Sequence, residues 1–271
     1  LNEFAKKYPK RFYDVGIAEQ HALTFAAGLS LSGHKPVVAI YSTFLQRAYD
    51  QLIHDIAIQN IPILFAIDRA GIVGADGATH SGNFDISFMR CIPNLVLMAP
   101  ANEADCYQML SFGYKHHGIC AVRYPRGESQ RNELEKTSAT IKLGIAKKIR
   151  SGKKIAILAF GTIVNTCLEI ADEINATLID MRFIKPIDKK IIKQVSLDHD
   201  YIITVEENVI SGGAGSAVLE VISQMQLDCK TLVIGIPDKF FEHGSQAEVL
   251  KECGLDKKSI KRKIVKQLKE W

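Results

Sequence analysis

The chain has 271 residues, of which 47% are hydrophobic and 24% charged, enough to bury the core of one large domain or two ordinary ones. A net charge of +4 is too small to indicate a nucleic-acid partner, and no apolar run is long enough to span a bilayer. The six cysteines are scattered without Cys-x-x-Cys spacing, which predicts reduced thiols in a cytosolic protein. Because the chain begins with Leu1, we expect it to be a piece of a longer protein.

The first predicted element is a strand that leads into a helix. Residues 12–15 are typical of a short strand, and Glu19 follows the turn at Gly16. A helix is predicted from Glu19 onward because apolar residues then recur at helical spacing, at Ala22, Phe25, Ala26 and Leu29. Open α/β sheets bind ligands beyond the carboxyl ends of their strands, where Glu19 would lie. Taken alone, Glu19 is better interpreted as an acid that complements the helix dipole, and the residues that follow along the chain favour the ligand site instead.

The next stretch alternates short apolar runs with helical patterns. This alternation predicts a parallel sheet covered on both faces. Residues 127–141 are polar, charged and without periodicity, so we interpret them as a linker between a first domain at 1–126 and a second at 142–271. The predicted strands of the first domain are 37–40, 63–67, 95–98 and 119–122, and its predicted helices are 44–58 and 102–115.

The second half repeats the pattern as a smaller α/β domain. Thr162 is the predicted N-cap of its first helix, and a glycine-rich turn at 211–215 precedes another helix that runs to about residue 226. We interpret the glycines of that turn as allowing close packing of a strand against a helix. A phosphate site is less favoured, because the turn lacks the full glycine spacing of the dinucleotide-binding motif. Residues 257–269 predict an amphipathic helix with a solvated basic face. The predicted strands are 155–160, 176–179, 201–205 and 231–236.

Three clusters of polar and aromatic residues follow consecutive strands, at 14–21, 41–47 and 68–82. The carboxyl ends of parallel strands share one edge of a sheet, so we expect the clusters to line one crevice. Each residue alone has an ordinary interpretation as a surface arginine, a loop histidine or a core aromatic. The long glycine-rich loop in the third cluster favours a functional role. The predicted crevice residues are Glu19, Tyr41, Phe44, Arg47, Arg69, Asp76 and His80.

These motifs resemble the 1-deoxy-D-xylulose-5-phosphate synthase family of transketolase-like thiamine diphosphate enzymes. The resemblance covers nearly the whole chain and implies a homodimer with two α/β domains. These would be a pyrimidine-binding domain with a parallel sheet, truncated at its start, and then a smaller transketolase C-terminal-type domain. The motifs are Asp-Val-Gly-Ile-Ala-Glu-Gln-His at 14–21, Tyr-Ser-Thr-Phe-Leu-Gln-Arg-Ala-Tyr-Asp-Gln at 41–51, Asp-Arg-Ala-Gly at 68–71, Asp-Gly-Ala-Thr-His at 76–80, Tyr-Pro-Arg-Gly at 124–127, Asp-Met-Arg-Phe-Ile-Lys-Pro at 180–186 and Val-Glu-Glu-Asn at 205–208.

The resemblance implies condensation of pyruvate with glyceraldehyde 3-phosphate and release of carbon dioxide, a step toward isoprenoid precursors. Glu19 would contact a ring nitrogen of the cofactor's aminopyrimidine and promote its activation, with the acid in a dry crevice. Phe44 would stack on that ring, and Ile17 would also bind the cofactor. The cofactor would serve as the electron sink during decarboxylation.

The same resemblance implies which residues bind the substrates. Arg69 and Arg126 would grip the acceptor phosphate, as bidentate guanidinium donors suit a dianion. Tyr41 would lie alongside, and Arg47 and Asp76 would line the pocket. His80 would line the pocket too, as a proton carrier or as a ligand of a carboxylate.

No metal site is predicted in this chain. Gly-Ala-Asp-Gly at 74–77, with Asn102 downstream, mimics the signature that holds Mg²⁺ and diphosphate in thiamine enzymes, but its middle residues are wrong. Asn102 is better interpreted as a helix cap after Pro100. The resemblance therefore implies that the Mg²⁺ ligands lie in a missing N-terminal domain and that this fragment alone is inactive.

Several alternatives stay open. The β chain of a 2-oxo acid dehydrogenase has the same two domains, although the 68–71 and 76–80 motifs suit a phosphosugar better than a lipoyl arm. A split transketolase is a further choice, and a non-catalytic dimerisation module comes from a different class. We expect no nucleic-acid or membrane partner, and a location in the bacterial cytoplasm or a plastid stroma.

Overall fold

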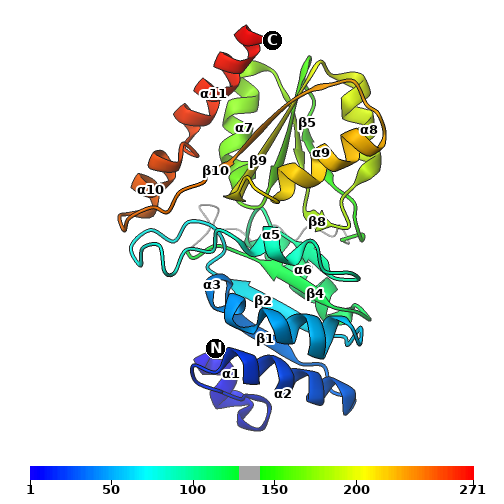
Figure 1. Ribbon diagram of the computed structural model, residues 1–271, viewed down its shortest axis with the longest axis vertical. Helices are drawn as coiled ribbons and strands as arrows, with labels where there is room; N and C mark the ends of the chain where they lie inside the picture. The colour runs from blue at the N-terminus through cyan, green and yellow to red at the C-terminus, as the bar shows by residue number, and fades with distance from the viewer. Residues whose placement is uncertain (128–140) are drawn as a thin grey trace.

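A computed structural model describes residues 1–127 and 141–271. Two five-stranded sheets lie one above the other in Figure 1, the first built mainly by the N-terminal half and the second by the C-terminal half. The predicted class, two α/β units with open sheets, is confirmed. Of the predicted linker, residues 128–140 lie outside the described residues.

The first sheet has the strand order β1-β2-β4-β3-β8. Its first four strands are parallel, as the buried apolar runs predict. The parallel sheet predicted for the first domain is confirmed, and β8 from the C-terminal half adds an antiparallel strand beside β3 at one edge. The strands are β1 (Val37–Tyr41), β2 (Leu64–Asp68), β3 (Val96–Met98), β4 (Cys120–Arg123) and β8 (Phe183–Lys185).

One prediction for the N-terminal half is wrong. Residues 12–15 form no strand and continue from a 3-10 turn as partly exposed chain, which pairs with no strand among the described residues. The prediction that 44–58 is helical is confirmed, although the winding changes along it from α to 3-10, back to α and then to π. The segments of this half are α1 (Asn2–Lys7), η1 (Pro9–Arg11), α2 (Glu19–Leu31), α3 (Ser42–Leu45), η2 (Gln46–Ala48), α4 (Tyr49–Gln51), η3 (Leu52–Ala57), α5 (Asp85–Met89) and α6 (Glu103–Lys115).

The second sheet has the strand order β10-β9-β6-β7-β5, in which only β5 runs antiparallel to its neighbour. Its strands are β5 (Lys147–Arg150), β6 (Ile155–Phe160), β7 (Thr177–Asp180), β9 (Tyr201–Val209) and β10 (Lys230–Ile236). The helices that flank it are α7 (Ile163–Ile174), α8 (Lys189–Asp198), α9 (Ala214–Gln224), α10 (Gln246–Cys253) and α11 (Lys257–Glu270).

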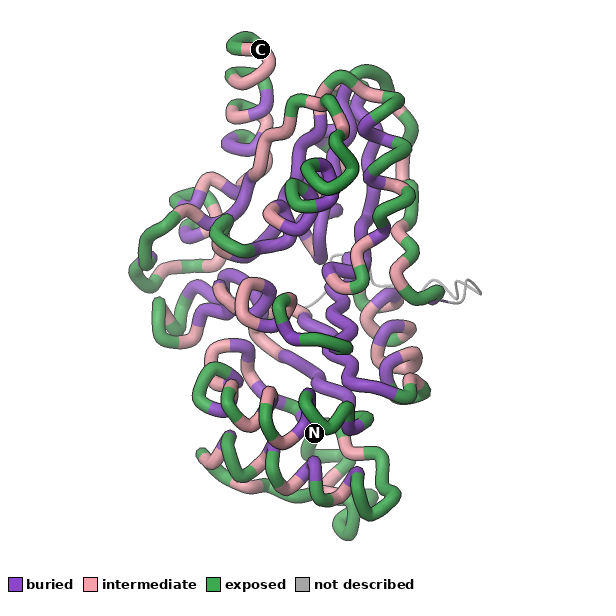
Figure 2. The backbone as a smooth tube through the Cα atoms, turned by 45° about the vertical axis from the view of Figure 1, so that its right-hand side comes forward, coloured by how far each residue is buried: buried purple, intermediate pink, exposed green. Residues whose placement is uncertain are grey.

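One large hydrophobic cluster joins the two halves. Leu97 on β3 and Leu158 on β6 are fully buried in the same cluster of apolar side chains. A second cluster fills the space between the C-terminal sheet and α7, α10 and α11, and a third packs α6 against the first sheet. Figure 2 shows the buried chain running continuously through both halves, whereas the chain near the N-terminus is largely exposed.

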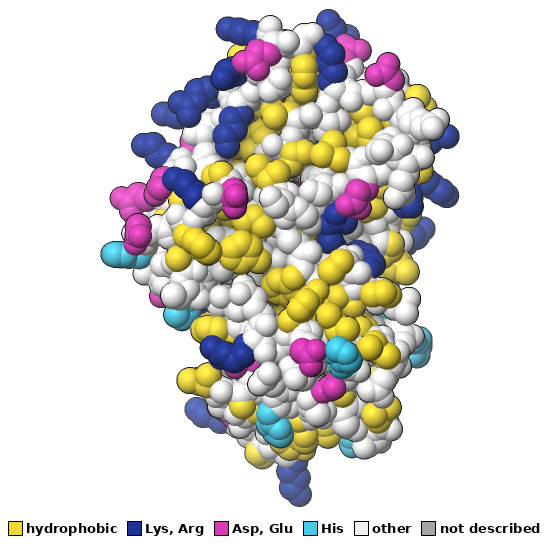
Figure 3. Space-filling model, in the orientation of Figure 1, with side chains coloured by type: hydrophobic (Ala, Val, Ile, Leu, Met, Phe, Trp, Pro, Cys, Tyr) yellow, Lys and Arg dark blue, Asp and Glu magenta, His cyan; other side chains and the backbone are white. Residues whose placement is uncertain are grey.

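The basic C-terminal segment forms the predicted amphipathic helix α11. Ile260 and Ile264 are buried against the core, and Lys and Arg side chains gather along the upper left edge of Figure 3, where α11 lies. Lys257 and Lys261 form ion pairs with Glu173 of α7, at 2.9 and 2.7 Å. In the part of the chain that the structure describes, no helix is long and apolar enough to cross a membrane.

The glycine-rich turn before α9 surrounds a carboxylate. Glu206 of β9 is fully buried and accepts hydrogen bonds from the backbone N–H groups of Ala214 (2.7 Å) and Gly215 (2.8 Å). Burial raises the pKa of Glu206 to about 7, although both donors and two nearby arginines favour the ionised form. The turn therefore packs tightly against β9, as expected, and the α9 N-terminus holds a carboxylate of the same chain.

Gly213→Ala is expected to lower the free energy of unfolding by about 1–3 kcal/mol, as overpacking does. A Cβ atom at Gly213 would lie 2.4 Å from Oε2 of Glu206 and 2.6 Å from the carbonyl oxygen of Val209. The matched control is Gly28→Ala in the middle of α2, where a Cβ atom meets nothing within 4 Å. Since Ala is the better helix former, the control should be stabilised by up to ~1 kcal/mol. Urea denaturation measures the free energy of unfolding of both variants. Equal changes in the two would contradict the tight packing of the turn against Glu206.

Candidate functional site

The three predicted clusters meet at one edge of the first sheet. Tyr41 ends β1 and Asp68 ends β2, and the two residues are register partners in adjacent parallel strands. Glu19 is the first residue of α2, which packs against β1 and the segments that follow it. The expected arrangement at the carboxyl ends of the strands is therefore present although residues 12–15 form no strand.

Glu19 is paired with Arg47. The carboxylate side chain is only 10% exposed, and Nη1 of Arg47 donates to both of its oxygens at 2.7 Å. Desolvation alone would raise the pKa of Glu19, but the hydrogen bond and charge of Arg47 hold it below its ordinary value. The acid is thus shielded from solvent and ionised, with a guanidinium as its partner.

Phe44 lies at the centre of the site. The Arg47 guanidinium carbon lies 5.9 Å from its ring centroid, and the Tyr41 ring stacks on it at 5.4 Å. His80 approaches Phe44 edge-on, with ring centroids 5.4 Å apart. The Phe44 ring therefore joins residues of the second and third clusters, and Arg47 links it to Glu19 of the first.

Arg69 extends the site on the Tyr41 side. Its guanidinium lies 3.7 Å from the Tyr41 ring centroid, and its Nη1 donates to Oδ2 of Asp68 at 2.9 Å. Arg69 has a positive φ of 57°, and its backbone N–H is held by Oδ1 of the same Asp68 at 2.7 Å. Among the described residues, its buried Nε has no hydrogen-bond partner.

The loop between Gly71 and Gly82 carries the remaining residues. It is closed at its base by reciprocal backbone hydrogen bonds of 2.8 Å between these two glycines. Asp76 in the loop forms an ion pair of 2.8 Å with Arg126, and both side chains are partly exposed. Arg126 and Asp76 thus lie together as an ion pair of their own. Ile17 is 91% exposed.

A buried network behind the site was missed at the sequence level. Nε of Arg123 pairs with Oδ2 of Asp85 at 2.8 Å, and its Nη2 donates to the carbonyl oxygen of Glu207 at 3.0 Å. Both charged side chains of the pair are almost inaccessible to solvent. The sequence does offer one indication, since Arg123 directly follows the apolar run 119–122 and should therefore be buried. A buried charge requires a partner of opposite charge. The network joins the first sheet to β9 of the second.

Two predicted helix caps have different outcomes. Asn102 caps α6, as its side chain accepts from the backbone N–H of Asp105 at 2.9 Å, which confirms the interpretation. Thr162 precedes α7 but makes no side-chain cap, and its hydroxyl interacts with Glu207 instead. Within residues 1–127 and 141–271, no group of three or more His, Cys, Asp or Glu side chains is placed to hold a metal ion.

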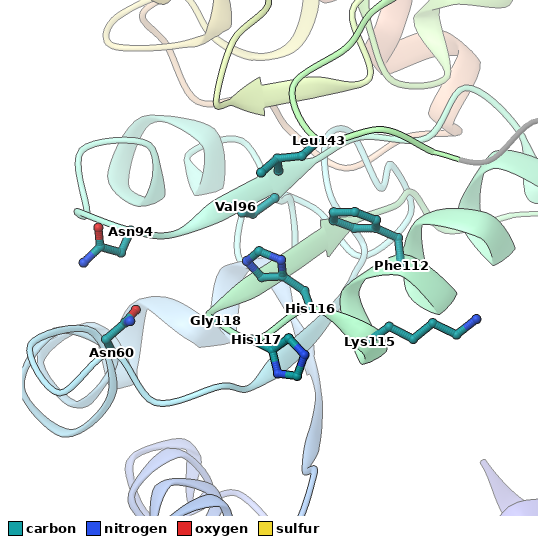
Figure 4. A pocket seen from close by; sticks show the side chains of 9 residues that line it. All are labelled: Asn60, Asn94, Val96, Phe112, Lys115, His116, His117, Gly118 and Leu143. Atoms are coloured by element: carbon teal, nitrogen blue, oxygen red, sulfur yellow. The ribbon is translucent and has the colours of Figure 1, made fainter.

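A cavity of about 560 Å³ lies elsewhere, at the amino ends of the strands in the first sheet (Figure 4). His116 and His117 precede β4 there, and the His116 ring stacks on Phe112 at 5.7 Å. Burial and the neighbouring His117 lower the pKa of His116. The cavity is at the opposite edge of the sheet from Glu19, so we do not assign it to the candidate site.

Each half of the chain matches a known domain family. Residues 1–131 match the family described as "Transketolase, pyrimidine binding domain", and residues 144–260 match "Transketolase, C-terminal domain". The fold agrees with a solved structure described as "Split gene transketolase, inactive beta4 tetramer", at a TM-score of 0.89 and 28% identity, covering 97% of this chain and 86% of that one. A transketolase from Campylobacter jejuni shares the fold at a TM-score of 0.72 and 19% identity, over 93% of this chain and 39% of that one.

The fold and the residues at its strand ends therefore define a transketolase-like α/β protein, and the chain belongs to that family. Within it, the chain is similar to 1-deoxy-D-xylulose-5-phosphate synthases. The chain is 58% identical to the synthase of Pasteurella multocida, and the match covers 97% of this chain and 42% of that protein. It is 54% identical to the synthase of Vibrio atlanticus, and the match covers 96% of this chain and 43% of that protein. The chain thus spans about two fifths of the length of these curated relatives.

Proposed function

We propose that the protein containing this chain condenses pyruvate with glyceraldehyde 3-phosphate, giving 1-deoxy-D-xylulose 5-phosphate and carbon dioxide, with thiamine diphosphate as its cofactor. The observation that carries the proposal is the unbroken series of contacts that links Glu19 through Arg47, Phe44 and Tyr41 to Arg69. In this series a shielded acid, a flat ring and two guanidinium groups lie close together, and guanidinium groups are well suited to bind anions. The names of the 54–58% identical relatives support the same reaction.

Glu19 and Phe44 fit the aminopyrimidine of thiamine diphosphate. A side chain that is 10% exposed can share a proton with a ring nitrogen without losing it to water, and the aromatic ring offers a flat neighbour. When bound, the cofactor supplies an electron sink for the loss of carbon dioxide from pyruvate. We propose that Glu19 exchanges Arg47 for the ring nitrogen, leaving Arg47 to bind an anionic substrate. We also propose that Mg²⁺ is held outside this chain.

Arg69 fits the phosphate of the acceptor, because its buried Nε has no partner within the described part of the chain. We propose that Arg126 assists once its ion pair with Asp76 opens, and that Tyr41 lies beside the phosphate. The His80 and Phe44 rings form a T-shaped pair, and a hydrogen bond with the Thr79 hydroxyl at 2.9 Å orients the His80 ring. His80 is then placed to carry a proton or to bind a carboxylate.

A split transketolase is the second candidate function. The chain covers 86% of the solved split-gene transketolase named above, which is described as an inactive tetramer. This likeness also supports our proposal that residues 1–271 turn over no substrate by themselves. The higher identity to the synthases, 58% against 28%, favours the pyruvate reaction. A homodimer and a cytoplasmic or plastid location stay predictions.

The test is an assay of the full-length gene product with thiamine diphosphate and Mg²⁺. With pyruvate and glyceraldehyde 3-phosphate, we expect mass spectrometry to detect 1-deoxy-D-xylulose 5-phosphate, and residues 1–271 alone to give none. A second reaction offers xylulose 5-phosphate and ribose 5-phosphate. Two-carbon transfer in that reaction, with no product from pyruvate, would instead favour the transketolase.

A further inference from the structure

Ile72 anchors the start of the 71–82 loop in the other half of the molecule. Its side chain is 1% exposed and belongs to the hydrophobic cluster of the C-terminal sheet, which includes Ile157, Phe241 and Val249. The loop that carries Asp76 and His80 therefore begins inside the core of the C-terminal half.

Both backbone groups of Ile72 also bind side chains of that half. Nε2 of Gln246, the first residue of α10, donates to the Ile72 carbonyl oxygen at 2.8 Å. The Ile72 N–H donates to Oε2 of Glu207, on β9, at a longer 3.4 Å. Gly71 permits this approach, because a Cβ atom there would lie 2.6 Å from the same Oε2.

The loop touches the C-terminal half again further along. The backbone N–H of Gly244 donates to the carbonyl oxygen of Gly74 at 3.4 Å. Glu207 is itself fixed, since the Arg123 guanidinium donates to its carbonyl oxygen from the first sheet. The contacts come from two separate elements of the C-terminal half, the end of β9 and the start of α10.

We propose that Gln246 and Glu207 are positioning residues, through which the C-terminal half fixes the 71–82 loop so that Asp76 and His80 meet the phosphorylated acceptor. The substrate named here rests on the proposed function. Fixing a residue of a free loop costs about 1–2 kcal/mol of conformational entropy, so an unanchored glycine-rich loop would have to be ordered by the substrate itself. A displacement of about 1 Å is enough to slow a reaction strongly.

The test compares Gln246→Leu and Gln246→Glu with wild type in the full-length gene product. Both variants lose the donor to the Ile72 carbonyl oxygen. We expect hydrogen–deuterium exchange in peptides covering 71–82 to quicken about tenfold, the size expected for one lost hydrogen bond. The KM for glyceraldehyde 3-phosphate should rise by about the same factor, while the KM for pyruvate changes less than about twofold.

Gln224→Leu is the matched control, because Gln224 is exposed at the end of α9 in the same half. Unchanged exchange in the loop of both Gln246 variants would overturn the proposal. Faster exchange without a rise in the KM for the acceptor would also overturn it, since the anchor would then serve stability alone. The exchange measurement needs no turnover, so it separates this inference from a failure of the proposed function.

Discussion

Glu19→Gln is expected to lower kcat of the full-length gene product by about 100-fold or more, since a positioned acid or base contributes about 10²–10⁴-fold to a rate. The substitution keeps the shape of the side chain but removes its ability to exchange a proton. Steady-state kinetics with pyruvate and glyceraldehyde 3-phosphate measure the effect. A variant that retains a tenth or more of the wild-type rate would contradict the role proposed for Glu19.

The loss should not come from unfolding. Arg47 is 54% exposed, so its ion pair with Glu19 is screened by water, and we expect the free energy of unfolding to change by about 1 kcal/mol or less. Glu3→Gln is the matched control, as Glu3 is exposed on α1 in the same part of the chain. That control should leave both the rate and the stability unchanged.

Arg123→Met is expected to lower the free energy of unfolding by about 3–5 kcal/mol, because it leaves a buried carboxylate without its partner. The Arg123 and Asp85 side chains are 4% and 0% exposed, and their ion pair measures 2.8 Å. The substitution also removes the hydrogen bond from Arg123 to the Glu207 carbonyl oxygen, which links the two sheets. Urea denaturation followed by circular dichroism measures the change.

Two further variants check that burial is the cause. Lys266→Met breaks the ion pair with Glu270, whose side chains are 76% and 52% exposed, and should cost about 0.3–0.5 kcal/mol. The double variant Arg123→Met/Asp85→Asn should recover part of the lost stability, because it removes the uncompensated charge. If Arg123→Met lowers the free energy of unfolding by no more than Lys266→Met does, the buried ion pair does not stabilise the junction of the two halves.

Much of the candidate site could be predicted from the sequence, because it follows from the order of strands and the residues after them. Tyr41 and Asp68 end strands that apolar runs had located to within one residue. Parallel pairing then brings the ends together, and the aromatic group around Phe44 results. The pairing of Glu19 with Arg47 was not predicted, since spacing along the chain does not say which charges meet.

The local winding of the chain was harder to predict. Helical spacing at 44–58 persists through α, 3-10 and π segments, because all three keep one apolar face toward the core. Residues 12–15 have the composition of a strand, but no strand in the described part of the chain pairs with them, and a strand needs a partner for its backbone groups.

By itself, the sequence determined the buried strands, the start of α2 at Glu19 and the Asn102 cap, since each depends on residues within a few positions of one another. Tertiary structure alone decided that β8 joins the first sheet, that Glu206 fills the glycine turn and that Ile72 enters the core of the C-terminal half. The contacts of β8 and of Ile72 join segments that are far apart in the sequence. The contact of Glu206 with the glycine turn depends on the direction of its side chain. A buried polar group needs a hydrogen-bond partner. Which residue supplies that partner depends on how the two sheets pack together, and spacing along the sequence does not show this.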